Sequence, residues 1–186
     1  EEAVSLILGI RYYGGFLLAA DGRSVSNNYL MEPTTKIKVK GSGTAVGYAG
    51  AQEWIAAYHN LLTDDAWALT HPKHVERLET LWGWHKRLDA AIGDIEKPSL
   101  GGIFVTEGAA VTFGEDTLPT PVENYCVLGM WPAVDGLLAV GWRSEMPLDH
   151  ARELAYQTIK HVSQHASNVG EPHSWWATGF YPVQYF

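Results

Sequence analysis

Four residues within the first fifty carry groups that together could transfer an acyl group. Ser5 offers a hydroxyl, Asp21 a carboxylate and Lys36 an ammonium, while Gly47 offers a backbone amide in a run of small residues. A serine hydroxyl attacks a carbonyl carbon only after a base has taken its proton. A backbone N–H can stabilise the oxyanion that forms in the attack. These groups are the parts that acyl transfer needs.

The surrounding pattern predicts two sheets that would bring these groups to one end. Apolar runs at residues 4–10 and 15–21 indicate two buried strands joined by a glycine turn. Residues 36–40 and 44–49 indicate a second hairpin around Gly41-Ser42-Gly43. Three lysines alternate with apolar residues in the first of these strands, which predicts one wet and one buried face.

Helices and further strands complete the predicted order. Apolar residues at helical spacing predict helices at about 51–62, 74–92 and 133–141 and from 147 onward. Strands are expected at 101–106, 109–113, 122–128 and 174–180. The inward stripe of the second helix is predicted to hold Val75, Leu78, Leu81, Trp82 and Leu88. This order fits two antiparallel sheets with a helix pair on each outer face.

Size and composition limit the class of protein. The chain has 186 residues, which predicts one domain over residues 1–186. Its apolar content of 46% and charged content of 18% are typical of a globular protein. Eight tryptophans indicate large packing surfaces, either in the core or between subunits.

Charge and cysteine usage narrow the expected partners and compartment. A net charge of −8 without a basic cluster predicts that the chain does not bind nucleic acid. No uncharged apolar run approaches the ~20 residues that span a bilayer, and the start of the chain lacks a signal-peptide pattern, so no membrane partner is expected. The chain has a single cysteine, Cys126, which excludes an internal disulfide and favours either a reducing compartment or indifference to redox; the location we expect is the cytoplasm.

Three segments, GGFLLAADGR, TKIKV and AVGYAG, resemble the proteasome β-subunit and HslV family of N-terminal-nucleophile (Ntn) hydrolases. The resemblance is strongest over residues 4–62 and rests on element order over residues 100–165. It implies an α+β fold, a four-layer αββα sandwich. It also implies a homo-oligomeric ring or stacked rings, a peptide substrate, and an ATPase unfoldase or activator as a candidate partner.

The resemblance also assigns roles to the residues. Ser5 stands at the nucleophile position, and its own α-amine would be the base once residues 1–4 are removed. Lys36 would lower the pKa of that amine, Asp21 would hold Lys36, and Arg23 would support them. The Gly47 N–H would bind the oxyanion. The implied activity is that of a serine- or threonine-type peptidase or amidase, with the peptide added as a strand along an exposed edge near Asp21 and Gly47.

A second function is left open by the same residues, that of a catalytically inactive structural subunit. Four residues precede Ser5, and the family's supporting Gly-Ser-Gly is replaced near Gly129. The supporting acid and serine are replaced by Ala166 and Val169. Ser5 could be an ordinary strand residue, the Asp21 ion pair could be structural, and Gly47 could serve close packing.

No cofactor or metal ion is expected. His161 and His165 lie four residues apart, and His71 and His74 lie close in sequence, but neither pair has a carboxylate at a diagnostic spacing. Cys126 lies among apolar residues, which favours a buried thiol over a nucleophile.

Overall fold

The structure is a computed structural model, and it describes most of the chain. Residues 1–4 and several internal segments fall outside the described part. The described residues are 5–23, 25–26, 29–30, 35–40, 43–50, 52–62, 64–93, 100–114, 118–129, 132–166, 169–180 and 182–186.

The first sheet has five antiparallel strands in the order β10-β1-β2-β11-β12. The β1–β2 hairpin is central, and its turn holds Gly14 at a φ of 111°, a conformation that favours glycine. The strands are β1 (Ile7–Tyr12), β2 (Gly15–Ala20), β10 (Tyr125–Leu128), β11 (Ser174–Ala177) and β12 (Gln184–Tyr185). Ile7 lies opposite Ala20, which in turn lies opposite Ser174, so these three residues form one row across the sheet.

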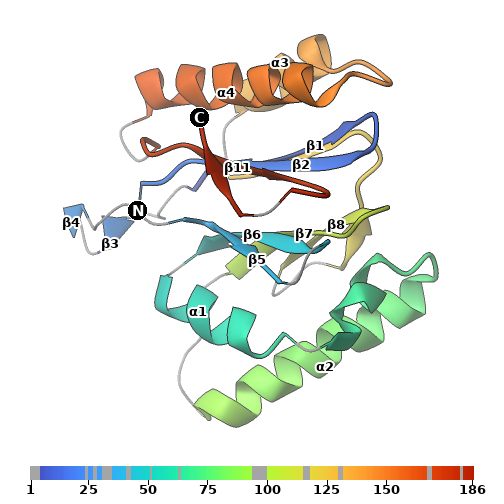
Figure 1. The fold of residues 1–186 in the computed structure, drawn as a ribbon. Coiled ribbons are helices and arrows are strands. Elements are labelled where there is room, and N and C mark those ends of the chain that lie inside the picture. The colour runs from blue at the N-terminus through green and yellow to red at the C-terminus, as the bar shows by residue number, and fades with distance from the viewer. Residues whose placement is uncertain are drawn as a thin grey trace.

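The second sheet faces the first and also has five antiparallel strands, in the order β5-β6-β7-β8-β9 (Figure 1). Its strands are β5 (Ile37–Val39), β6 (Ala45–Gly50), β7 (Leu100–Val105), β8 (Ala110–Gly114) and β9 (Thr120–Pro121). A separate two-stranded ladder joins β3 (Val25–Ser26) to β4 (Tyr29–Leu30). The predicted strand at 122–128 is wrong in its first part, because only β10 forms there and it pairs with β1 in the other sheet.

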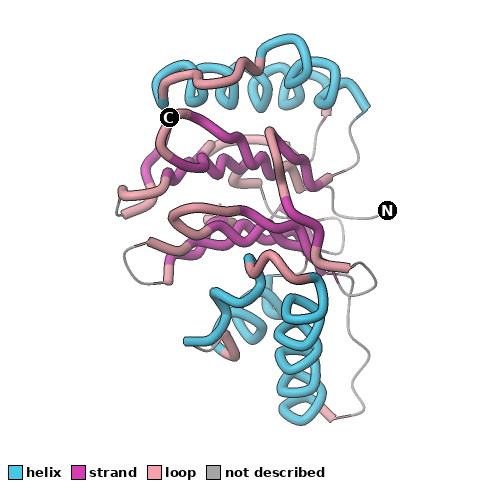
Figure 2. The backbone as a smooth tube through the Cα atoms, turned by 90° about the vertical axis from the view of Figure 1, so that its right-hand side faces the viewer, coloured by secondary structure: helices cyan, strands magenta, loops and turns pink. Residues whose placement is uncertain are grey.

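Helices lie on the outer side of each sheet (Figures 1 and 2). The first sheet packs against α3 (Pro132–Gly141) and α4 (Leu148–His165). The second packs against α1 (Gln52–Asn60) and the 3-10 helix η1 (Asp64–Thr70), and α2 (His74–Ile92) packs against η1. No helix among the described residues is long and apolar enough to cross a bilayer.

Three apolar clusters follow the period-two alternation of the strands. One lies between the first sheet and its helices, one between the two sheets, and one between the second sheet and α1, η1 and α2. Leu6 and Leu8 face α4, whereas Ile7 faces the second sheet, where it meets Ile37 and Ile103. The end of β1 is therefore fixed from both sides.

The expected four-layer αββα sandwich is wrong, and the described residues are a mixed α+β protein of two antiparallel sheets and four α-helices. The expectation placed a helix pair on each outer face. One face instead carries α1, the unpredicted η1, and α2 lying on η1. The predicted stripe of α2 is also corrected, since Val75 and Trp82 are exposed while Trp84 is buried.

Candidate functional site

The centre of the candidate site is a buried ion pair that joins the two sheets. Asp21 follows β2 in the first sheet, and Lys36 precedes β5 in the second. Lys36 Nζ lies 2.6 Å from Asp21 Oδ1. The Asp21 side chain is fully buried and the Lys36 side chain is 2% exposed, so water screens this pair little. The expected wet face of the lysine strand is wrong for Lys36, because its ammonium turns inward to the carboxylate.

Asp21 is held by backbone donors as well as by the lysine. The Leu6 N–H donates to Oδ1 at 2.8 Å, and the Arg23 N–H donates to Oδ2 at 3.1 Å. The Asp21 N–H in turn donates to the Leu6 carbonyl at 3.1 Å. Both carboxylate oxygens are therefore committed, which fixes the position of the Lys36 ammonium.

Ser5 is next to this carboxylate in space, because its carbonyl carbon is bonded to the Leu6 nitrogen, and the Leu6 N–H donates to Asp21. Ser5 is itself buried, at 8% exposed. Its carbonyl oxygen lies close to Gly129, where an added Cβ would overlap it. Gly129 has a φ of 111°, so two separate constraints require glycine beside Ser5.

Burial acts on the ammonium of Lys36. It lowers the pKa of Lys36 below its usual value, and the charge and hydrogen bond of Asp21 oppose that fall. A buried ammonium with one carboxylate partner is a fixed positive charge that a neighbouring amine would feel strongly.

Gly47 lies in the interior of the second sheet, opposite Ile37 on one side and Ile103 on the other. A Cβ at this position would lie 2.7 Å from Ile7 Cγ2 in the first sheet. The glycine thus lets the two sheets approach near the start of β1. Its role as an oxyanion donor stays a prediction.

The exposed edge expected for a peptide near Asp21 and Gly47 is wrong. β2 lies between β1 and β11, and β6 lies between β5 and β7, so neither strand is an edge. The edge strand beside the ion pair is β5, which begins one residue after Lys36.

Arg23 supports the site through its backbone and through packing. Its N–H caps Asp21, as described above, and its guanidinium packs over Gly170, where an added Cβ would lie 2.7 Å from Arg23 Nε. Gly22 N–H donates to the Gly170 carbonyl at 2.9 Å. The segment before β11 therefore closes over the end of β2.

Sequence reasoning missed two polar residues in that closing segment, His173 and Ser174. Both are buried, and the His173 Nε2 and Ser174 Oγ atoms have no hydrogen-bond partner among the described residues. Ser174 lies opposite Ala20, next to Asp21 in the chain. The sequence does show two polar residues, His173 and Ser174, directly before the aromatic residues of β11. It does not show how β11 is aligned with β2, so their position beside Asp21 could not be predicted.

Two positions at which the sequence resemblance implies supporting polar groups, residues 166 and 169, hold apolar side chains. Val169 is buried in the cluster between the first sheet and α4, and Ala166 packs against the same cluster. Met130 and Trp131 lie outside the described residues.

The remaining candidates form no second chemical centre in the described part of the chain. His161 and His165 have ring centroids 4.9 Å apart, but no group of three metal-ligating side chains was found among the described residues. Burial raises the pKa of Cys126 to about 12, which makes its thiol a poor nucleophile.

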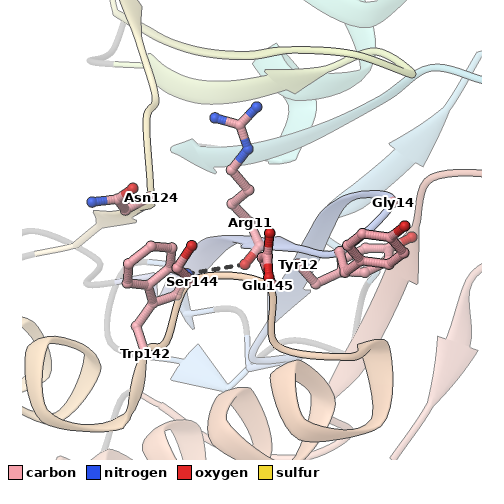
Figure 3. Close-up of a pocket in the computed structure, with 8 residues that line it drawn as sticks. Arg11, Tyr12, Gly14, Asn124, Trp142, Ser144 and Glu145 are labelled. Carbon is pink, nitrogen blue, oxygen red and sulfur yellow. Dashed lines mark hydrogen bonds between the residues drawn. The ribbon is translucent and has the colours of Figure 1, made fainter.

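A pocket lies at the other end of β1, at the β1–β2 turn (Figure 3). Its volume is about 330 Å³, and its wall includes Arg11, Tyr13, Trp142 and Glu145. Trp142 Nε1 donates to the Arg11 carbonyl at 3.0 Å, which fixes the indole in the wall. None of the candidate catalytic residues lines this pocket.

No protein-family model matches the chain, and no curated protein matches it. Solved structures do match over nearly the whole chain. A mutant of Anbu from Hyphomicrobium sp. strain MC1 is 13% identical with a TM-score of 0.73, covering 97% of this chain and 86% of that one. Another Anbu structure from this strain is 15% identical with a TM-score of 0.71, at 97% and 86% coverage. The Anbu complex from Pseudomonas aeruginosa, solved as a helical assembly, is 13% identical with a TM-score of 0.67, at 96% and 81% coverage.

These likenesses correct the family named from the sequence segments. The expected resemblance to proteasome β-subunits and HslV is replaced by likeness to Anbu structures. At 13–15% identity the likeness establishes the fold alone. The described chain therefore shares the fold of these Anbu structures.

Proposed function

We propose that this chain is a subunit of a self-associating peptidase or amidase, with Ser5 as nucleophile after removal of residues 1–4. One observation carries the proposal, namely the buried Lys36 ammonium held by Asp21, whose carboxylate also binds the amide that follows Ser5. The Anbu likeness supports the scaffold, and the helical assembly of the Pseudomonas complex supports self-association. Peptide substrates and a cytoplasmic location belong to the same proposal.

The proposed reaction uses the chain's own groups. The free α-amine of Ser5 takes the hydroxyl proton as the oxygen bonds to the substrate carbonyl carbon. The amine has a reference pKa of about 7.7–8.0, and the Lys36 charge favours its neutral form. The leaving amine then receives the proton, and water hydrolyses the Ser5 ester and regenerates the hydroxyl.

The test compares chains that differ only at their N-terminus. A chain that begins at Ser5, released from a fusion by a specific protease, is assayed with a panel of fluorogenic peptide amides beside the chain that retains residues 1–4. We expect turnover from the first alone. Ser5→Ala in the shortened chain keeps the amine and is expected to reduce turnover to background. Ser163→Ala on α4, where the hydroxyl donates to the Lys160 carbonyl, is the matched control with unchanged rate.

A second function, a catalytically inactive structural subunit, is favoured by the burial of Ser5 and by the apolar residues at the supporting positions. It predicts assemblies of normal size that retain residues 1–4 when purified from their own cells. Intact-mass measurement on that material distinguishes the two functions. A mass beginning at Ser5 supports the hydrolase, and a retained N-terminus without peptide turnover in the shortened chain refutes it.

A further inference from the structure

His173 immediately precedes β11, the strand that pairs with β2, and Asp21 immediately follows β2. The ladder between β11 and β2 ends at the pair Ser174–Ala20, and continuing this antiparallel register by one residue brings His173 to the position opposite Asp21. Opposite residues in antiparallel strands have Cβ atoms about 4.5–5.5 Å apart. The two segments stay adjacent beyond this pair, because the Gly22 N–H donates to the Gly170 carbonyl.

The imidazole of His173 is enclosed without being fully bonded. The side chain is 7% exposed, and Nε2 has no hydrogen-bond partner among the described residues. Its backbone carbonyl accepts the Phe186 N–H at 3.2 Å, which ties the segment to the end of the described chain. A buried ring nitrogen left unbonded is unusual in a folded protein and requires an explanation.

The charges around this ring come from three sides. Asp21 approaches from β2 and Glu171 from the preceding segment, and both favour the protonated ring. On α4, the centroid of the Tyr156 ring lies 6.4 Å from the centroid of the His173 ring, and the Lys160 ammonium lies over the Tyr156 ring. Burial is the larger influence and lowers the pKa of His173. The ring is therefore neutral near pH 7 and has two carboxylates nearby when it takes a proton.

We propose that His173 is a positioning residue that shares the Asp21 carboxylate with Lys36. The neutral ring leaves both carboxylate oxygens to Lys36 and to the Leu6 and Arg23 amides. A proton taken from solvent turns the ring into a second cation that competes with Lys36 for Asp21. In acid, protonated His173 therefore weakens the ion pair between Asp21 and Lys36. Its effect on catalysis rests on the proposed function, whereas the sharing of Asp21 is measured without substrate.

The first experiment is an NMR titration of the His173 ring in the full chain and in two variants of opposite effect. Asp21→Asn removes the carboxylate and is expected to lower the pKa of His173, whereas Lys36→Met frees the carboxylate and is expected to raise it. Each shift should be roughly one unit. The ring signals of His150, which is exposed on α4, serve as the internal control. A His173 titration unchanged in either folded variant overturns the proposal.

His173→Gln provides a second measurement that does not depend on those variants folding. The unfolding midpoint in urea of the full chain should fall as the pH drops below about 6.5, because the unfolded histidine binds the proton first. His173→Gln should flatten this fall, and an identical pH dependence in both proteins overturns the proposal. In the chain that begins at Ser5, His173→Gln should shift the acid limb of the pH–rate profile, with His173→Phe as the packing control. If the chain that begins at Ser5 shows no turnover, but the pKa of His173 still responds to the Asp21 and Lys36 variants, the proposed function is refuted and the sharing of Asp21 is not.

Discussion

Breaking the Asp21–Lys36 pair from one side should destabilise the protein far more than replacing both partners. Asp21→Asn leaves a 2% exposed ammonium without its counter-charge. It also places an amide group where Leu6, Arg23 and Lys36 all donate. Removing one partner of a buried pair costs about 3–5 kcal/mol. Lys36→Met should cost less, because the carboxylate keeps two backbone donors and can take up a proton.

The double variant Asp21→Asn with Lys36→Met carries no buried charge, and such replacements are often close to neutral. Each variant loses some free energy of unfolding relative to the unchanged protein. We expect the losses of the two single variants, added together, to exceed the loss of the double variant by about 2 kcal/mol or more. The Arg152–Asp149 pair on α4 is the matched control. Its atoms lie 3.1 Å apart, but its side chains are 40% and 86% exposed, so the same cycle should give below about 1 kcal/mol.

The measurement is urea unfolding at pH 7 followed by tryptophan fluorescence and by circular dichroism, with the slope of each transition compared among variants. Equal slopes license the comparison of free energies. Losses that simply add, with a coupling as small as that of the α4 pair, would refute the reasoning, because they would mean that Lys36 does not depend on Asp21 for its charge.

Three further predictions test the surroundings of the site. Gly129→Ala should destabilise the protein by at least about 2 kcal/mol, because its Cβ overlaps the Ser5 carbonyl at a positive φ, whereas Gly136→Ala, in open space on α3, should stabilise it by about 0.5–1 kcal/mol in the same urea assay. Cys126 is half-buried and its pKa is raised to about 12, so at pH 8 the native protein should react with a thiol reagent far more slowly than the protein unfolded in urea, and equal rates would contradict this. Burial and the charges of Lys40 and Lys38 lower the pKa of His59 to about 4, so the unfolded chain binds the proton more strongly between pH 4 and 6.5, and stability should fall as the pH drops through this window. His59→Gln should remove about 1–3 kcal/mol of that fall, and an unchanged pH dependence would contradict the assignment.

The parts of the fold that local pattern determines were predicted from the sequence. The β1–β2 and β5–β6 hairpins follow from apolar runs around glycine turns, and α2 follows from its spacing. The inward face of α2 was not determined in this way. Val75 and Trp82 lie seven residues apart on one stripe, and Leu81, Trp84 and Leu88 lie on another, so both stripes fit a helix. Only packing against the second sheet decides which stripe is buried.

The local sequence pattern could not predict which distant strands pair with each other. The segment at 120–128 contributes β9 to one sheet and β10 to the other, and no local signal marks that crossing. The Asp21–Lys36 contact could be predicted because both residues end or begin recognisable strands. His173 could not be placed, because its neighbour depends on the register of β11, which lies more than 150 residues from β2 in sequence.

The cost of burying the ion pair bears on which function the site serves. The pair joins the two sheets, but apolar side chains of similar size could join them without desolvating two charges. The chain already places such residues there, since Ile7, Ile37 and Ala20 meet in the same space. A purely structural subunit would gain little from an ammonium at this position. A hydrolase would gain a fixed charge beside the residue whose amine must stay neutral. Under the proposed function, the retained charge therefore serves chemistry at Ser5 rather than stability.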